Sequence, residues 1–189
     1  MKIGILGGTF NPIHIGHLIL GEEACRILNL DRLIFVPAYL PPHKEERDLI
    51  DAEDRYKMVA LAIKGNPFFE VSKSEIKKKG KSYSIQTIRE FKDRFGKKAE
   101  LFLITGSDVL EELSMWKEID KIFKLSNFIV ANRPGYPTKE VPPEIRLISI
   151  IAIDLFSSGI RERIREGKSI RYLVPENVWR YIVKKKLYL

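Results

Sequence analysis

A glycine-rich segment near the start of the chain combines residue types that can hold a phosphate: Gly7-Gly8-Thr9-Phe10-Asn11-Pro12-Ile13-His14-Ile15-Gly16-His17. Glycines let backbone amides approach a phosphate closely, and a helix that begins nearby adds the positive end of its dipole. His14 and His17 are three residues apart, so on one helical turn both imidazoles can face the same anion. The segment therefore predicts an anion site in which two histidines counter negative charge.

The histidine pair has a second interpretation, because neighbouring imidazoles also bind zinc. No third protein ligand follows at a familiar spacing, and a lone histidine is more often a core or surface residue. The chain has three histidines, and all of them fall in this segment or in Pro41-Pro42-His43-Lys44. We therefore predict no protein-held metal and favour anion binding.

The elements that position these residues alternate between short apolar strands and amphipathic helices. We expect strands at 2–6, 32–36, 68–71, 101–105, 127–131 and 145–150, and helices at 16–29, 51–64, 84–95, 108–113, 157–166 and 175–185. Apolar strands without alternation are typical of parallel strands covered on both faces. The pattern predicts an α/β fold with a doubly wound parallel sheet and helices on both faces, and ligands should bind at the carboxyl ends of the strands.

The composition is that of one folded domain. The chain has 189 residues, 44% of them apolar and 31% charged, which suits one core better than two full-sized modules. We expect a single domain over residues 1–189 with a C-terminal helical part at about 157–189. The apolar runs are too short for a membrane span, and the start lacks the pattern of a signal peptide. With Cys25 as the sole cysteine, these features favour a cytoplasmic protein without a membrane partner.

The chain is basic, because 33 Lys and Arg against 25 Asp and Glu give a formal net charge of +8. This charge attracts anionic partners, and nucleotides and RNA both qualify. An RNA-binding domain would need aromatic residues interleaved with a basic patch. The most basic run, Lys77-Lys78-Lys79-Gly80-Lys81, is better interpreted as a solvated loop, so we predict no nucleic-acid partner.

The glycine-histidine segment resembles the nucleotidyltransferase superfamily whose signature is His-x-Gly-His, and its flanks are similar to the nicotinate mononucleotide adenylyltransferase version. The resemblance covers nearly the whole chain. Further matches, in chain order, are Pro41-Pro42-His43-Lys44, Lys81-Ser82-Tyr83-Ser84-Ile85-Gln86-Thr87, Gly106-Ser107-Asp108, Trp116, Arg133-Pro134-Gly135-Tyr136 and Ser157-Ser158-Gly159-Ile160-Arg161. The chain departs from the usual family pattern at Phe156 and Lys117. The resemblance implies a Rossmann-like nucleotidyltransferase fold and transfer of AMP from ATP to nicotinate mononucleotide, giving deamido-NAD and pyrophosphate in NAD biosynthesis.

The resemblance also assigns residues to ATP. Backbone donors of the loop after the first strand would meet its phosphates, and two serines and an arginine at the start of a late helix would hold the β- and γ-phosphates. The ATP-binding set is Gly8, Thr9, Phe10, His17, Lys44, Gly106, Asp108, Ser157, Ser158 and Arg161. His14, His17 and Arg161 are the expected catalytic residues, because they would stabilise charge during transfer. The alternatives are an N-cap role for Asp108, an N-cap with an exposed arginine at the late helix, and a solvated Lys44.

The acceptor side follows from the same resemblance. The residues expected to bind nicotinate mononucleotide are Asn11, Lys44, Tyr83, Ser84, Trp116 and Arg133. Trp116 would stack on the pyridine ring, while Tyr83 and Ser84 would frame the carboxylate largely through backbone groups. The alternative for Trp116 is a core position.

The implied reaction is attack of the mononucleotide phosphate on the α-phosphorus of ATP. Because this nucleophile is already an anion, no general base or covalent intermediate is needed. Mg²⁺ is expected with ATP, held mainly by phosphates and water, so no carboxylate cage has to appear in the sequence. ATP and nicotinate mononucleotide are the expected partners, with a homo-oligomer left open.

Other enzyme families share parts of this pattern. His14-Ile15-Gly16-His17 also spells a signature of aminoacyl-tRNA synthetases, but no Lys-Met-Ser-Lys-Ser segment occurs, and Val71-Ser72-Lys73-Ser74 lies too early to replace it. Pantetheine-phosphate adenylyltransferases and cytidylyltransferases differ around the His-x-Gly-His motif. They also lack this combination of Pro41-Pro42-His43-Lys44 with Trp116.

Overall fold

The computed structural model describes residues 1–42, 49–132 and 141–189 of the chain. Within them, six parallel strands form one sheet in the order β3-β2-β1-β4-β5-β6. The strands are β1 (Lys2–Gly8), β2 (Arg32–Pro37), β3 (Phe69–Val71), β4 (Glu100–Gly106), β5 (Asn127–Ala131) and β6 (Ile145–Ile148). The predicted doubly wound parallel sheet is confirmed.

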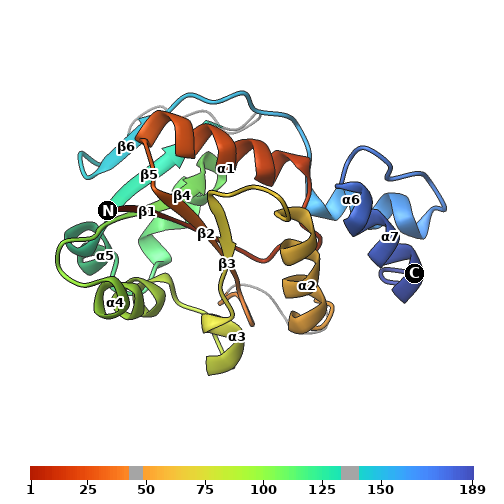
Figure 1. The fold of residues 1–189 in the computed structure, drawn as a ribbon, viewed down its shortest axis with the longest axis horizontal. Helices are drawn as coiled ribbons and strands as arrows, with labels where there is room; N and C mark the ends of the chain where they lie inside the picture. Colours follow the sequence, from red (N-terminus) through yellow and green to blue (C-terminus); the bar gives the residue numbers. More distant parts are fainter. Residues whose placement is uncertain (43–48, 133–140) are drawn as a thin grey trace.

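Helices cover both faces of this sheet. In Figure 1, α1 (Ile15–Leu28) crosses one face, while α4 (Ser84–Phe95) and α5 (Ile119–Leu125) lie on the opposite side. The remaining helices are α2 (Ala52–Ala62), α3 (Ser74–Lys78), the 3₁₀ helix η2 (Ser107–Met115), α6 (Ser157–Arg165) and α7 (Glu176–Lys185). No helix in the described part of the chain is long and apolar enough to cross a membrane.

β1 shows why the strands are apolar without alternation. Ile3 and Ile5 point into the core cluster that includes Ile88 and Phe91 of α4. Leu6 belongs to the other cluster, which contains residues of α1, α2, α6 and α7. Because both faces are covered, polar residues have no exposed face to occupy along this strand.

The C-terminal helices extend the core beyond the sheet. α6 and α7 lie beside α2 at the right of Figure 1. Val178 and Ile182 of α7 are buried against the α1 and α2 side, and the hydroxyl of Tyr181 donates to Oδ1 of Asp54 on α2 at 2.5 Å. This packing brings the start of α6 back to the loop after β1.

Several elements differ from the sequence-based expectation. α3 and α5 were not predicted; they span only five and seven residues, too few to show a helical period. The helix expected at 108–113 is the longer 3₁₀ helix η2. Lys77 and Lys78, expected in a solvated loop, form the end of α3, although their side chains are exposed.

Candidate active site

The ends of β1 and β4 lie together at the carboxyl edge of the sheet. The two strands are neighbours, and Leu6 is registered with Ile104, two residues before each strand ends. The chain leaves β1 toward β2 on one side, and β4 leads to β5 on the other. This reversal of strand order is where doubly wound sheets bind ligands. The loop after Gly8 and the segment after Gly106 are therefore brought to one place.

Phe10 shapes the loop after β1. Its backbone adopts the left-handed region with φ of 48°, which is costly for a bulky residue and persists only where its surroundings fix it. Its ring is buried, 5.9 Å from Phe35 and 5.0 Å from His17 between centroids. A Cβ on Gly8 would approach the Phe10 ring to 2.9 Å, so the ring lies where only glycine leaves room. Phe10 can therefore meet a ligand only through its backbone.

His14 and His17 lie side by side at the start of α1. The backbone N–H of His14 donates to Nδ1 of His17 at 3.2 Å, and the two ring centroids are 3.7 Å apart with planes tilted by 32°. His14 is buried and His17 half-buried. Because Nδ1 of His17 accepts a hydrogen bond, its neutral imidazole carries the proton on Nε2. The Nε2–H of His17 can thus act as a hydrogen-bond donor to an anion.

The C-terminal part holds the same loop from α6 and from the segment after α7. The Ser157 hydroxyl donates to the carbonyl of Pro12 at 2.9 Å, and Nη1 of Arg161 donates to the carbonyl of Asn11 at 2.9 Å. The hydroxyl of Tyr188 donates to Oδ1 of the buried Asn11 at 3.0 Å. The structure therefore brings Ser157 and Arg161 to the loop, with Asn11 between them and Tyr188.

Phe156 and Ser158 flank Ser157 at the start of α6. Ser158 is exposed on the first turn, and Phe156 is the residue before the helix. Nε of Arg161 is buried and has no hydrogen-bond partner in the described ranges. A guanidinium in this state retains capacity for an acceptor such as a phosphate oxygen.

Gly106 and Asp108 follow β4 at the same edge. Gly106 is the residue before η2, and Asp108 lies in the first turn of that helix, half-buried. The N-cap role considered for Asp108 is therefore wrong, because Gly106 takes that position. Its carboxylate lies at the carboxyl end of β4, where a ribose or an amine could donate to it.

Three of the residues expected to bind the acceptor, Tyr83, Ser84 and Trp116, lie around the starts of α4 and α5. Tyr83 immediately precedes α4, whose first residue is Ser84. Nζ of the exposed Lys117 lies 4.7 Å from the centroid of the Tyr83 ring. Trp116 follows the last residue of η2, and its ring makes an edge-type contact with Phe128, with centroids 5.6 Å apart and planes at 62°. Trp116 is half-buried, so it both borders the core and exposes part of its ring.

Lys44 and Arg133, also expected at the site, lie outside the described residues. The connection that leads to Lys44 is nevertheless anchored at its start. The backbone N–H of Tyr39 donates to Oγ of Ser82 at 2.9 Å, and the N–H of Ser82 donates to the carbonyl of Leu40 at 2.9 Å. This pairing joins the connection after β2 to the segment that enters Tyr83.

Arg55 is a site residue that sequence reasoning missed. It lies on α2, is 1% exposed, and donates to the carbonyls of Thr9 at 2.8 Å, Ala38 at 2.5 Å and Tyr39 at 2.7 Å. Its buried neighbours on the helix are Ala52, Met58 and Val59. An arginine at helical spacing within an apolar stripe was the signal that could have identified it.

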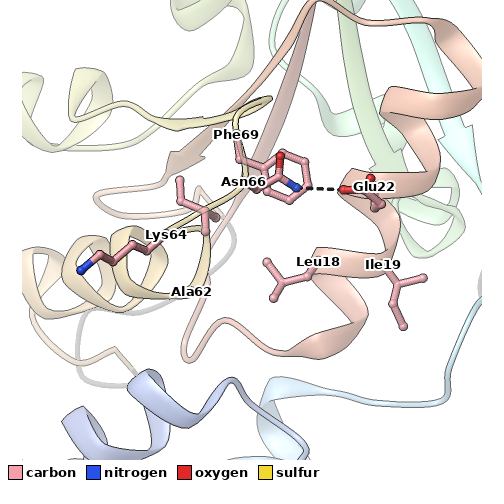
Figure 2. Close-up of a pocket in the computed structure, with 8 residues that line it drawn as sticks. Leu18, Ile19, Glu22, Ala62, Lys64, Asn66 and Phe69 are labelled. Atoms are coloured by element: carbon pink, nitrogen blue, oxygen red, sulfur yellow. Dashed lines mark hydrogen bonds between the residues drawn. The ribbon is translucent and has the colours of Figure 1, made fainter.

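A separate hollow lies between α1 and the connection from α2 to β3 (Figure 2). Its volume is about 300 Å³, and the side chains of Glu22 and Asn66 join across it by a hydrogen bond of 2.9 Å. Apolar side chains such as Leu18 and Phe69 form much of the remaining wall. The residues expected from the sequence to bind substrates do not line it, so this hollow is not the candidate active site.

Comparison with known proteins identifies the family. Residues 5–170 match a family model described as cytidylyltransferase-like. A Thermoanaerobacter sp. (strain X514) protein named as a probable nicotinate-nucleotide adenylyltransferase is 43% identical over 199 residues, covering 100% of this chain and 94% of the relative. A Corynebacterium kroppenstedtii protein of the same name is 39% identical over 193 residues, covering 100% and 91%.

A solved structure shares the fold. The Plasmodium falciparum nicotinic acid mononucleotide adenylyltransferase complexed with NaAD matches with a TM-score of 0.80 and 18% identity, covering 99% of this chain and 97% of that chain. At that identity the likeness establishes the architecture, whereas the bacterial relatives match over the whole sequence. The chain belongs to the nicotinate-nucleotide adenylyltransferase family, within the cytidylyltransferase-like group.

Proposed function

We propose that this chain transfers AMP from ATP to nicotinate mononucleotide, giving nicotinate adenine dinucleotide (deamido-NAD) and pyrophosphate in NAD biosynthesis. The observation that carries the proposal is the stacked pair of His14 and His17 at the start of α1, directly after the loop with left-handed Phe10. The sequence that carries this arrangement is 43% identical to a relative named as a probable nicotinate-nucleotide adenylyltransferase.

The phosphates of ATP would be held by the loop after β1 and the start of α6. Gly8, Thr9 and Phe10 would offer backbone groups to the phosphates, with Ser157, Ser158 and Arg161 reaching them from α6. The contacts of Ser157 with Pro12 and of Arg161 with Asn11 support this, because they hold both groups within reach of the same loop. Gly106 and Asp108 would meet the adenosine, and Lys44 would add a cation.

The chemistry requires alignment and charge stabilisation. The mononucleotide phosphate attacks the α-phosphorus, the bond to the bridging oxygen breaks, and pyrophosphate leaves from the opposite side with that electron pair. The Nε2–H of His17 would donate to an oxygen on which negative charge builds, and His14 holds His17 through its backbone N–H. Arg161 would stabilise the charge of the leaving pyrophosphate. No side chain has to remove a proton from the nucleophile, which is already an anion.

The acceptor would lie against Tyr83, Ser84 and Trp116. The first backbone N–H groups of α4 have no partner within the helix, so they could donate hydrogen bonds to a carboxylate there. Trp116 would stack on the pyridine ring, and Asn11 and Arg133 would be further contacts of the mononucleotide. The position of Lys117 over Tyr83 supports an added attraction for an acidic acceptor.

Mg²⁺ is expected to accompany ATP. In the described ranges, no group of three His, Cys, Asp or Glu side chains gathers as a metal would require. The donor set therefore suits an ion held by phosphate oxygens and water, which would neutralise phosphate charge when bound.

The remaining expectations belong to the same proposal. The whole chain, residues 1–189, would act as one domain, since residues after α6 share a core with α1 and α2. The expected compartment is the cytoplasm, and neither a nucleic acid nor a membrane is needed as a partner. Two substrates, ATP and nicotinate mononucleotide, suffice for the reaction.

The test is an assay of the purified protein with Mg²⁺ and ATP and one acceptor at a time: nicotinate mononucleotide, nicotinamide mononucleotide or phosphopantetheine. We expect pyrophosphate and nicotinate adenine dinucleotide in equal amounts with the first acceptor. A parallel series with CTP tests the cytidylyltransferase alternative suggested by the family model. Pyrophosphate release only with phosphopantetheine, or only with CTP, would overturn the proposal.

A further inference from the structure

Arg55 places a guanidinium beneath the nucleotide loop. The side chain is 1% exposed, and its hydrogen bonds reach the carbonyls of Thr9, Ala38 and Tyr39 through the terminal nitrogens, with Nε reaching the carbonyl of Ile50 at 3.2 Å. These carbonyls belong to three separate stretches of backbone. One arginine therefore joins the loop after β1, the connection after β2 and the approach to α2.

Burying the Arg55 guanidinium costs free energy. Removing a guanidinium from water disfavours its charged form, and burial lowers the pKa of Arg55. The group still stays protonated at neutral pH because the ordinary pKa of arginine is so high. An apolar side chain of similar size often stabilises a fold as well as a buried charge does. The arginine fits a position where backbone geometry has to be specified.

The bond to Thr9 determines where the next amide points. In a planar trans peptide, the C=O of Thr9 and the N–H of Phe10 point in opposite directions. Arg55 holds the Thr9 carbonyl toward α2, so the Phe10 N–H is directed away from it. The left-handed φ of Phe10 depends on the same peptide plane. Arg55 thereby sets the direction of an amide in the predicted phosphate loop.

The bonds to Ala38 and Tyr39 extend this control to the second substrate. Both carbonyls immediately follow β2. The backbone N–H of Tyr39 in turn donates a hydrogen bond to Oγ of Ser82, the residue before Tyr83. The guanidinium therefore sets the spacing between the phosphate loop and the segment that enters α4.

We propose that Arg55 is a positioning residue for nucleotide transfer: it directs the Phe10 amide toward the ATP phosphates and fixes the spacing between the two substrate segments. This inference rests on the proposed function. Arg55 itself touches neither substrate, and it acts through the backbone of Thr9, Ala38 and Tyr39.

The test compares Arg55→Met, which removes every donor, with Arg55→Lys, which keeps the charge but not the fork. Lys57→Met is the matched control, because Lys57 is an exposed cation on the same helix. Binding of Mg²⁺-ATP without acceptor is measured by calorimetry. Saturated kcat with nicotinate mononucleotide is measured well below each melting temperature and expressed per folded molecule.

For Arg55→Met, we expect ATP binding at least tenfold weaker and kcat lower by roughly tenfold to a hundredfold, as for reacting groups displaced by about 1 Å. Arg55→Lys should recover part of both losses, and Lys57→Met should match the wild type. A purely structural role would lower only the melting temperature. ATP affinity and kcat within twofold of wild type in Arg55→Met would overturn the proposal. If that variant does not fold, the same result in Arg55→Lys overturns it. Wild-type protein that binds no ATP would instead overturn the proposed function itself, and this inference with it.

Discussion

The backbone N–H of His14 donates to Nδ1 of His17 at 3.2 Å, so the first turn of α1 determines which nitrogen of His17 carries the proton. The stacked His14 ring, 3.7 Å away between centroids, limits rotation of the His17 side chain. His17 is thus oriented before any substrate binds. Such preorganised donors are worth more to a reaction than flexible ones, because no reorganisation is needed as charge develops.

We predict that His17→Ala lowers kcat by roughly a hundredfold or more while the melting temperature changes little, since the side chain is only half-buried. His17→Asn can keep an acceptor near Nδ1 but cannot replace the Nε2 donor, so its kcat should fall as far. His17→Gln, whose amide reaches farther, should retain more activity. Steady-state kinetics and thermal melts check this, and near-normal turnover in folded His17→Ala would contradict it.

Arg161→Ala should chiefly weaken ATP binding, by about tenfold or more, because a guanidinium at a helix start can pair with two phosphate oxygens. Arg161→Lys should restore binding only partly. Arg161 also donates to the carbonyl of Asn11, so loop disturbance is a second route to the same loss. Calorimetry with Mg²⁺-ATP measures the effect. Normal ATP affinity with a selective loss of mononucleotide binding would assign Arg161 to the other substrate.

Tyr188→Phe separates loop support from phosphate binding. It removes the hydroxyl that donates to Oδ1 of Asn11 but leaves the buried ring in place. Losing a donor to a buried acceptor costs about 1–2 kcal/mol, so the free energy of unfolding in urea should fall by that amount. ATP affinity should change less than threefold. A loss of ATP affinity as large as that in Arg161→Ala would mean that both variants act through Asn11.

These contacts mark the limit of what the sequence can predict. The strands follow from apolar runs, and the site of His14 and His17 follows from glycines beside a helix start. Both signals are local. Arg55, by contrast, acts on Thr9 and Tyr39, and Tyr188 acts on Asn11. The apolar stripe of α2 could indicate that Arg55 is buried, but the partner atoms of Arg55 and Tyr188 lie far along the chain, so no sequence spacing identifies them before the fold is known.

The outcome for the acceptor side has a similar physical cause. Ser84 begins a helix as expected, since the strongly amphipathic stretch that follows makes α4 easy to predict. The position of Lys117 could not be predicted, because it depends on how η2 ends. Trp116 has extended backbone there, and Glu118 adopts a left-handed conformation before α5 begins. That turn directs Lys117 back over Tyr83.

The contact between α7 and α2 predicts a pH dependence. Burial and then the hydrogen bond to Asp54 raise the pKa of Tyr181 to about 12. Since the folded-state pKa lies above the unfolded value near 10, Tyr181 contributes stability that is complete below about pH 10 and is lost as pH rises toward 12. Tyr181→Phe should therefore be less stable by about 1 kcal/mol at pH 8, and the difference should vanish near pH 12. Urea unfolding of both proteins from pH 8 to pH 12 measures it; a difference independent of pH would show that the hydroxyl's ionisation is not involved.

The last prediction concerns the choice between nicotinate and nicotinamide mononucleotide. Both acceptors can stack on Trp116, so a preference has to come from the carboxylate. Backbone donors at Ser84 would meet a second donor, the amide NH₂, in nicotinamide, and such a mismatch costs about 1–3 kcal/mol. Lys117, 4.7 Å from the Tyr83 ring centroid, adds a cation that favours the acid. At an exposed site this attraction is worth about 1 kcal/mol or less, or up to roughly fivefold in rate.

We therefore expect the wild type to favour nicotinate mononucleotide in kcat/KM, and Lys117→Met to lose up to about fivefold toward that acceptor with little change toward nicotinamide mononucleotide. Lys124→Met is the charge control. It removes a different exposed cation, which lies on α5, and should leave selectivity unchanged. Trp116→Ala should lower kcat/KM for both acceptors and keep their ratio, because stacking does not distinguish the rings. Equal loss toward both acceptors in Lys117→Met would remove Lys117 from carboxylate recognition. Equal wild-type efficiency with the two acceptors would refute the nicotinate assignment, since neither the α4 amides nor Lys117 would then be reading the carboxylate.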